Sequence, residues 1–467
     1  MLRPMGEAAR MAWETSRRFA VLLATLLVLQ ACAAEGDLAQ PEGDPTTPLT
    51  STATVPPLDM TASPLLPTPD STFAPLPTVL PSPSATYTPD PEAARMLAAG
   101  NRNMENGNYA GAVNDYSLAL RVDATYAEAA CRRGMAWAAL GNDEAAFSDY
   151  ALALALDPHL VAAYVARARL YHRRGDSEAA LADLAQAEAL DPHYGETYLA
   201  RAYLYRDLGD AARALEDFNR AVLLMPQRVE AYIGRALLYE ASGDLTLAQI
   251  DLNVALAIAP SNAEAYYARG RVRAAQGDLV GALADYEQAY DLGLRDTALS
   301  IDLAELYLVS GDSVAARRTL NAALIRDPTN AEAHYWLGLA LFTEGDYDAA
   351  VGEANLALVY QPDSAAALGL RATAYLYLER WQRAIEDFRA AYALNPAYVD
   401  ALFGMAQAQV RQGDTQGALA TLEAYLGAAP ADGRNRAAAA ALRDWLLGMA
   451  TPPAGATPTL APPTGLP

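Results

Sequence analysis

Apolar and polar positions along most of the chain repeat with a period of 34 residues. In a unit that begins at Ala127, two apolar stretches of helical length flank a Gly, and the second stretch ends at a Pro. Gly can close a helix in the left-handed conformation, and Pro lacks the N–H that would continue one. The pattern therefore predicts helix, tight turn, helix and turn in each unit, with successive units stacked on one another.

The turn residues recur with the same period. Gly stands at position 15 of the unit and is followed by Asp or Asn, and Pro stands at position 32. The glycines are Gly107, Gly141, Gly175, Gly209, Gly243, Gly277, Gly311, Gly345 and Gly413, with Glu379 in place of a tenth. The prolines are Pro158, Pro192, Pro226, Pro260, Pro328, Pro362, Pro396 and Pro430, and Leu294 takes the place of one more.

Two positions of the unit stay small throughout. Position 8 is Gly or Ala, as at Gly134 and Ala168, and position 20 is always Ala, as at Ala146 and Ala180. Position 4 is often Tyr, and so is position 11. Small residues let two helices approach at the short end of the usual spacing, so positions 8 and 20 predict where the antiparallel pair touches.

This order of residues resembles the tetratricopeptide repeat: large at 4, small at 8, Tyr at 11, Gly-Asp at 15 and 16, Ala at 20 and Pro at 32. The resemblance covers ten units, from Ala93 to about Asp432. It implies an all-α fold, a right-handed α-solenoid built of helix-turn-helix units. It also implies that a protein or peptide binds in a concave groove lined by the first helix of each unit, without catalytic residues or a cofactor.

The rest of the chain divides by composition. Residues 1–34 have the outline of a signal peptide, and residues 35–91 are rich in Pro, Thr and Ser, which predicts a disordered stalk. Residues 92–432 hold the ten repeats. Residues 433–449 predict an amphipathic helix that caps the open end of the stack, with the helix itself expected over 436–449, and residues 450–467 resemble the stalk.

The leader carries Arg17 and Arg18, then an apolar run over 19–29, and then Cys32. Leu29-Gln30-Ala31-Cys32 resembles a bacterial lipobox, in which the Cys is acylated, although Gln30 departs from that pattern. The alternatives are an uncleaved anchor and ordinary cleavage that leaves a secreted protein. The first interpretation predicts a lipid-anchored protein of the bacterial cell envelope, outside the cytoplasm.

Charge and motifs exclude several classes of function. The formal net charge is −22 and the chain has no Lys, which argues against nucleic acid as a partner. None of the four histidines has a second ligand at metal-binding spacing, and no phosphate loop or nucleophile elbow is present. We therefore expect no enzyme activity, no metal and no cofactor, while the oligomeric state stays open.

A systematic feature of the units is an Arg at position 7 together with an acid at position 23. Units seven and ten, which lack the Arg, also lack the acid. We predict a ladder of ion pairs in which each Arg bridges the acid of its own second helix, that of the preceding unit, or both. The arginines are Arg133, Arg167, Arg201, Arg235, Arg269 and Arg371, and the acids are Asp115, Asp149, Asp183, Asp217, Asp251, Asp285, Glu353 and Asp387.

Positions 5, 9 and 12 of the first helices predict the groove lining. A middle zone is basic and aromatic, a later zone is aromatic and apolar, and together they predict a docked segment with acidic and apolar residues. The candidates are Arg169, His172, Tyr203, Arg206, Tyr267, Arg271, Tyr335, Leu339, Phe342 and Phe403. For any single one of these residues, packing against a neighbouring first helix explains its presence equally well. The predicted function is a membrane-tethered binding scaffold, and the alternative is a module for cell-wall glycan or small ligands.

The repeat pattern weakens between units six and seven. Gly293 and Leu294 stand near the place of the expected Pro, and Ser300 replaces the large residue at position 4. We expect a looser junction at 293–300.

Overall fold

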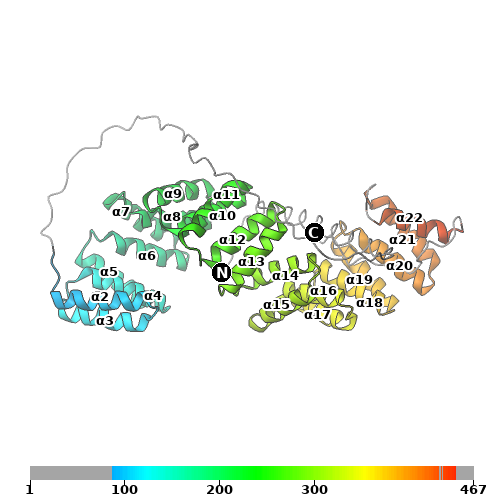
Figure 1. Cartoon of the computed structure of the whole chain (residues 1–467), viewed down its shortest axis with the longest axis horizontal. Helices are drawn as coiled ribbons and strands as arrows, with labels where there is room; N and C mark the ends of the chain where they lie inside the picture. Colours follow the sequence, from blue (N-terminus) through cyan, green and yellow to red (C-terminus); the bar gives the residue numbers. More distant parts are fainter. Residues whose placement is uncertain (1–86, 431–432, 434, 449–467) are drawn as a thin grey trace, which may run out of the picture.

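The computed structural model describes residues 87–430, 433 and 435–448, and these form 21 α-helices and no strand. Antiparallel helix pairs stack side by side into an elongated array that runs from α2 to α22 (Figure 1). The predicted α-solenoid is therefore confirmed. The expected leader and tail, and most of the expected stalk, lie outside the described residues.

The helices alternate between the two positions of each repeat. The first helices are α2 (Pro91–Glu105), α4 (Ala127–Ala139), α6 (Val161–Arg174), α8 (Gly195–Asp207), α10 (Val229–Ser242), α12 (Ala263–Ala275), α14 (Thr297–Val309), α16 (Ala331–Thr343), α18 (Ala365–Tyr377) and α20 (Asp400–Gln412). The second helices are α3 (Tyr109–Val122), α5 (Asp143–Leu156), α7 (Ser177–Leu190), α9 (Ala211–Leu224), α11 (Leu245–Ile258), α13 (Leu279–Asp291), α15 (Ser313–Arg326), α17 (Tyr347–Tyr360), α19 (Trp381–Leu394) and α21 (Thr415–Ala428). The helix that follows the tenth unit, α22, covers Arg436–Leu446, packs against α21 and is shorter than the 436–449 expected.

The turn inside each unit has the predicted geometry. Every repeat Gly has a positive φ, between 71° at Gly107 and 90° at Gly413, and Glu379 adopts φ 57° in the place of the missing Gly. In most units the following Asp or Asn begins the second helix. The Asp176 carboxylate, for example, accepts a hydrogen bond from the Ala179 N–H. One short segment thus closes the first helix and starts the second.

Within each unit, the two helices pack through small and large residues of complementary size. The Ala at position 20 has no exposed surface in any of the ten units. Position 8 is Gly in four units, and in three of these a tyrosine ring at position 24 fills the space that a methyl group would need. A Cβ on Gly134 would lie 2.7 Å from a ring atom of Tyr150, and one on Gly270 would lie 2.5 Å from a ring atom of Tyr286. Small and large residues therefore compensate each other across the pair.

The junction between units six and seven differs from the others. Every other pair of successive first helices makes close contacts in the described part of the chain, but α12 and α14 do not approach one another as closely. At the end of α13, Gly293 adopts φ 99° and the Leu294 N–H donates to the Ala289 carbonyl, so a Gly cap replaces the Pro stop. A hydrogen bond of 2.9 Å from the Tyr267 hydroxyl to Asp302 bridges the two first helices.

None of the described helices combines the length and the apolar composition that a membrane crossing requires.

Candidate functional site

The position-7 arginines form regular rungs inside the array. Each rung is a bidentate pair in which Nε and Nη2 of the Arg donate to the two carboxylate oxygens of the Asp at position 23 of the same unit, at 2.6 to 2.9 Å. The six rungs are Arg133–Asp149, Arg167–Asp183, Arg201–Asp217, Arg235–Asp251, Arg269–Asp285 and Arg371–Asp387. We call this set the ladder. Bidentate charge-assisted bonds fix both partners in one geometry.

The preceding unit also contributes, but through a different residue from the expected acid. Nη1 of Arg235 donates to Asn219 at 2.8 Å, and Nη1 of Arg269 donates to Asn253 at 2.9 Å. Arg371 contacts Asn355 in the same way, and in the fourth unit Arg201 reaches Glu188 instead. Each of these arginines therefore joins the two helices of its own unit to the second helix of the unit before it.

The pairing has physical consequences for both partners. The carboxylates are almost fully buried, with side chains from 4 to 12 % exposed, while the guanidinium groups keep some contact with solvent. The hydrogen bond to Asp251 raises the pKa of Arg235 against the opposing effect of burial. The repeat tyrosines also contact the ladder, because the Arg235 guanidinium lies 5.9 Å from the ring centres of both Tyr232 and Tyr239.

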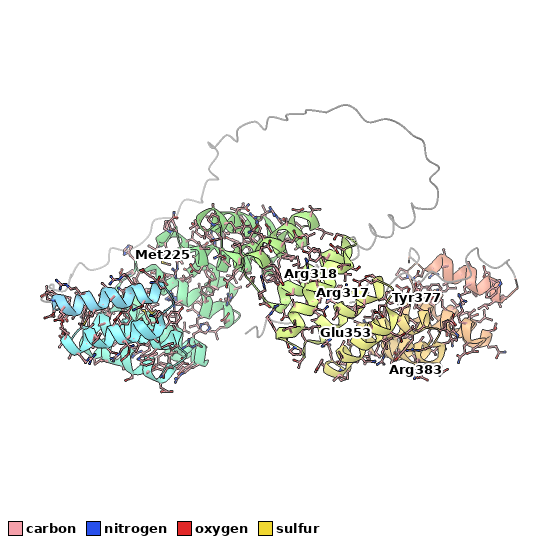
Figure 2. All side chains as sticks on the ribbon, turned by 60° about the horizontal axis from the view of Figure 1, so that its bottom comes forward. Met225, Arg317, Arg318, Glu353, Tyr377 and Arg383 are labelled. Carbon is pink, nitrogen blue, oxygen red and sulfur yellow. The ribbon has the colours of Figure 1, made fainter. Side chains whose placement is uncertain are left out.

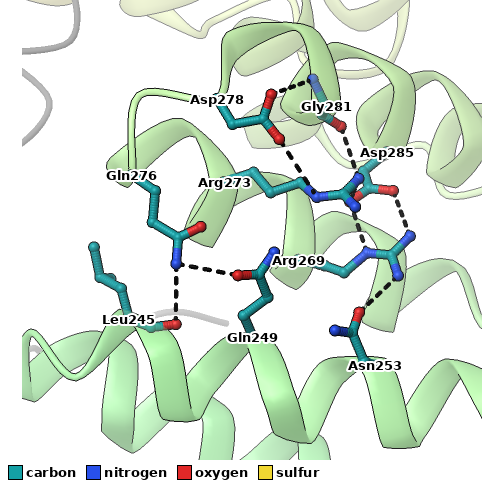
Figure 3. A network of polar contacts seen from close by, with 9 residues as sticks. All are labelled: Leu245, Gln249, Asn253, Arg269, Arg273, Gln276, Asp278, Gly281 and Asp285. Atoms are coloured by element: carbon teal, nitrogen blue, oxygen red, sulfur yellow. Dashed lines mark hydrogen bonds and ion pairs between the residues drawn. The ribbon is translucent and has the colours of Figure 1, made fainter. Parts of the chain in front are cut away.

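Around the sixth unit the ladder widens into a network (Figure 3). Arg273 donates to Asp285 at 2.8 Å, so this carboxylate accepts from two guanidinium groups. Arg273 also lies 3.8 Å from Asp278, the residue that begins α13. This network joins the end of α12 to the start of α13 and to α11 of unit five.

Two acids predicted for the ladder have other partners, which corrects the prediction. Asp115 accepts a hydrogen bond of 2.8 Å from Asn103, because position 7 of the first unit is Ala. Glu353 lies on α17 (labelled in Figure 2), with one oxygen 2.7 Å from Nδ1 of His334. The other ring nitrogen of His334 lies 3.0 Å from the Pro328 carbonyl. The His therefore takes over the bond that Tyr198 and Tyr232 donate to the equivalent Pro carbonyls.

The first helices present positions 5, 9 and 12 on a common side, which we call the first-helix face. In Figure 2, Tyr377 on the first helix α18 and Arg383 on the second helix α19 lie on opposite sides of the array. All ten predicted groove residues belong to first helices, those of the middle zone to α6, α8 and α12 and those of the later zone to α16 and α20.

The middle zone is not the exposed basic patch that the spacing suggested. Arg169 pairs with Glu196, and Arg271 donates to Glu240 at 2.7 Å. Arg206 pairs with its neighbour Asp207 at 2.8 Å, and His172 lies 3.1 Å from the same carboxylate. The positive charges of these arginines are therefore balanced by the chain itself.

The tyrosines of the middle zone are also engaged. The Tyr203 hydroxyl donates to the Glu230 carbonyl at 2.9 Å, and the Arg206 guanidinium lies 4.8 Å from the centre of its ring. Burial raises the pKa of Tyr203 to about 12. Tyr267 donates to Asp302, and the Arg271 guanidinium lies 5.9 Å from its ring centre. The middle zone is a polar surface in which hydrogen bonds and ion pairs between side chains hold neighbouring first helices together.

The later zone is apolar and closely packed. Tyr335 and Phe342 belong to one buried cluster, and Leu339 packs against it. Phe342 also contacts the rings of Tyr347 and Tyr377, whose centres lie 5.2 and 5.3 Å away. Phe403 lies in the next cluster, with its ring 5.6 Å from Tyr425. For Tyr335, Phe342 and Phe403 the packing alternative accounts for most of the side-chain surface.

The acids that neutralise the middle zone were not predicted from the sequence. Glu240 and Arg271 are 31 residues apart, and Arg169 and Glu196 are 27 apart. Both pairs span neighbouring first helices, and the separation of about one period is the signal that could have linked them. No cluster of three or more metal-ligating side chains lies within the described residues.

Comparison with family models identifies the class of protein. The tetratricopeptide repeat model matches residues 97–160, 199–263, 301–367 and 370–433, and two further models with the same description match 161–194 and 273–328. The chain therefore belongs to the tetratricopeptide repeat family, and it is a repeat scaffold suited to protein–protein interaction.

Individual relatives are distant. A tetratricopeptide repeat and J domain-containing co-chaperone, DNJ1, from Cryptococcus neoformans var. grubii is 35 % identical over 86 residues, which are 18 % of this chain and 16 % of that protein. This chain thus spans about a sixth of that relative.

Two solved structures are similar to part of this chain. YrrB, described as a tetratricopeptide repeat protein with an unusual peptide-binding site, is 25 % identical with a TM-score of 0.38, and the match covers 40 % of this chain and 97 % of YrrB. PilW, a type IV pilus biogenesis factor, is 18 % identical with a TM-score of 0.41, covering 44 % of this chain and 96 % of PilW.

Proposed function

We propose that this chain is a membrane-tethered scaffold outside the cytoplasm that binds a protein or peptide segment along its first-helix face. The observation that carries the proposal is the uninterrupted series of ten repeats behind a leader and a Pro-rich segment. A stacked array provides a long, rigid surface, and a Pro-rich segment acts as a spacer.

The tether is proposed from the leader. The apolar run over 19–29 is shorter than a comfortable membrane span, and Cys32 follows it at the place where a lipobox has its acylated residue. A lipid on Cys32 would hold the array in the envelope, with residues 35–91 between lipid and repeats. Because the proposed lipid attaches to a single residue, one substitution tests this part of the proposal.

The first experiment labels the chain in a bacterial host with an alkyne fatty acid. Wild-type chain is expected to take up the label and to sediment with membranes, while Cys32→Ala loses both properties. Cys131→Ala is the matched control, because Cys131 is 2 % exposed and burial raises the pKa of its thiol to about 12. Equal labelling of wild type and Cys32→Ala would reject the lipid anchor.

The second experiment identifies the class of ligand. Chain purified from detergent-solubilised envelope is compared with chain incubated with isolated wall polymer. If a protein co-purifies stably with the chain and wall glycan does not displace it, the result supports the proposed protein-binding scaffold. Binding to the polymer alone would instead support the glycan-binding alternative.

A further inference from the structure

The second helices form the side of the array opposite the first-helix face, and α15 differs there from the other nine. Helix α15 packs against α14 and α16, and its five buried residues all lie on the side that faces them. The opposite side carries a row of residues spaced at i, i+4, i+7 and i+11, which places them on one face of the helix. We call this row the α15 stripe, and it consists of Val314, Arg318, Asn321 and Ile325.

All four residues of the α15 stripe are exposed to solvent. Val314 is 59 % exposed and Ile325 is 82 % exposed, so a large aliphatic side chain lies in water at each end of the stripe. Arg318 and Asn321 lie between them and are exposed as well. In Figure 1, α15 lies along the lower edge of the array. The stripe is therefore a free surface of the described part of the chain.

The combination of residues in the stripe occurs in no other unit. The stripe occupies positions 18, 22, 25 and 29 of unit seven, and the other nine second helices have at most one large aliphatic residue at these positions. Val280 and Val359 belong to the second helices of the adjacent units, α13 and α17, and are 82 and 68 % exposed. Exposed aliphatic residues that gather on neighbouring helices are typical of a contact with another protein.

The order of residues in the stripe is self-complementary. When two such stripes run antiparallel, Val314 of one copy meets Ile325 of the other at both ends, and Arg318 meets Asn321 twice in the middle. We propose that two copies of this chain associate through α15, with the two helices antiparallel and related by a twofold axis. The aliphatic pairs remove from water the surface that a single chain exposes, and each Arg318 guanidinium donates to the side-chain oxygen of Asn321 in the other copy.

The partner is a second copy because the same stripe supplies a suitable neighbour at each of its four positions. A parallel pair would place the two Arg318 groups directly opposite each other, where like charges repel. The antiparallel pair also suits the helix dipoles, because the positive N-terminus of each α15 lies beside the negative C-terminus of the other. Chemistry and electrostatics therefore favour the same arrangement.

The dimensions of the stripe set the strength of the association. Eleven steps of about 1.5 Å make the stripe roughly 16 Å long, so the interface is small and the dissociation constant is expected in the micromolar range. The first-helix faces of both copies stay uncovered, because they lie on the other side of each array. The dimer would thus present two binding faces and gain avidity for a partner with two copies of the bound segment.

The first test measures the association of the full chain, purified in a non-ionic detergent, by sedimentation velocity over a range of concentrations. Wild type is expected to pass from monomer to dimer. Ile325→Arg and Val314→Asp are each expected to raise the dissociation constant at least about tenfold, because the new charge loses water against an aliphatic side chain of the other copy.

Both variants are expected to fold. The two positions are exposed, and an acid near the start of a helix and a base near its end both suit the helix dipole. A normal helical circular dichroism spectrum checks the fold. Leu223→Arg is the matched control, because Leu223 stands at position 29 of unit four and is 71 % exposed. This control is expected to leave the dissociation constant unchanged.

Mixing the two variants tests the antiparallel arrangement. In a mixed dimer, the acid introduced at position 314 of one copy faces the base introduced at position 325 of the other, and the unchanged Ile325 and Val314 form the second pair. The mixture is expected to dimerise within about threefold of wild type, although neither variant does so alone. A parallel arrangement brings the two new charges against aliphatic residues and gives no recovery.

Three results would overturn the inference: a wild type that stays monomeric, an association that responds to neither variant, or a mixture that fails to recover. None of them concerns the first-helix face. Chains that carry Ile325→Arg should still co-purify with a partner bound to that face, so failure of this inference and failure of the proposed function are distinguishable.

Discussion

Units two to six and units seven to ten use the same backbone with different interiors. In the first group an Arg–Asp rung lies between the helices of every unit. In unit seven the equivalent residues are Leu303 and Thr319, which are 2 % and 5 % exposed. Unit eight uses His334 and Glu353, and only unit nine of this group has a rung. The repeat therefore needs this space to be filled, and a charge pair is one of several ways to fill it.

This difference explains why the ladder is weak evidence for a net gain in folding stability. Burying two charges costs desolvation energy, and the attraction between them restores it only when the geometry is good. Units that use Leu and Thr avoid this cost and retain the same helix pair. What the rungs add is connection, because five of the six arginines also bond a polar side chain of the preceding second helix. Four of these bonds are 2.7 to 3.3 Å long, and the fifth joins Arg201 to Glu188.

The first prediction compares a variant that breaks one rung of units two to six with a variant that replaces the rung by the residue pair of unit seven. Arg235→Ala leaves Asp251 buried without its partner and is expected to lower the local free energy of unfolding by about 3 to 5 kcal/mol. The double variant Arg235→Leu, Asp251→Thr reproduces the pair of unit seven and is expected to cost less than about 1.5 kcal/mol. Native-state hydrogen exchange in α10 and α11 measures both, because a repeat array does not unfold in one step. Equal losses in the two variants would contradict this account.

Much of the fold could be predicted from the sequence, because the repeat units are bounded by local chemistry. Gly at position 15 and Pro at position 32 act within a few residues of the helix ends they define, and each copy repeats the signal. The side-chain partners were harder. The joint loss of Arg and acid indicated that positions 7 and 23 interact, but the choice between an acid of the same unit and one of the preceding unit depends on how successive units are rotated.

The candidate site was less predictable for the same reason. Positions 5, 9 and 12 correctly placed Arg271 and Tyr335 on first helices, but their environment is set by the neighbouring unit. Arg271 meets Glu240 across two helices, and Tyr335 is enclosed by a cluster that extends into unit nine. Helical periodicity places a side chain on a face. It does not show what the next repeat brings against it.

The second prediction concerns the boundary between the two groups. Because α12 and α14 lack the close approach seen at the other junctions, amides at 293–300 are expected to exchange faster than those of the Pro-containing turn around Pro328. The expected ratio is roughly tenfold, equivalent to about 1.4 kcal/mol of opening free energy. Replacing Tyr267 by Phe removes the bond to Asp302 and should increase the difference. Equal exchange in the two turns would mean that the array is uniform across this junction.

The third prediction uses a turn in the group without a continuous ladder. Glu379 adopts φ 57°, a conformation that costs a residue with a side chain roughly 1 to 2 kcal/mol. Glu379→Gly is therefore expected to stabilise unit nine by about 1 kcal/mol. The mirror variant Gly345→Glu, at a site with φ 85° where a Cβ would touch nothing, should lose a similar amount. Hydrogen exchange in α18 and in α16 reports the two effects, and a destabilised Glu379→Gly would show that the Glu side chain has a role of its own.

The fourth prediction has the smallest expected effect and concerns two acids that share one ladder arginine. Arg201 bonds the buried Asp217 and also Glu188, whose side chain is 38 % exposed. The hydrogen bond from Arg201 lowers the pKa of Glu188, so its stabilisation is present above the unfolded pKa of about 4.3 and is lost as the pH falls through the lower folded value. Because solvent screens this pair, Glu188→Gln is expected to cost less than about 1 kcal/mol at pH 7, and less still in 1 M salt. The cost should disappear in acid, when Glu188 is protonated in the wild type as well. A cost that is unchanged from pH 7 to pH 3 would show that Glu188 contributes through packing rather than through its charge.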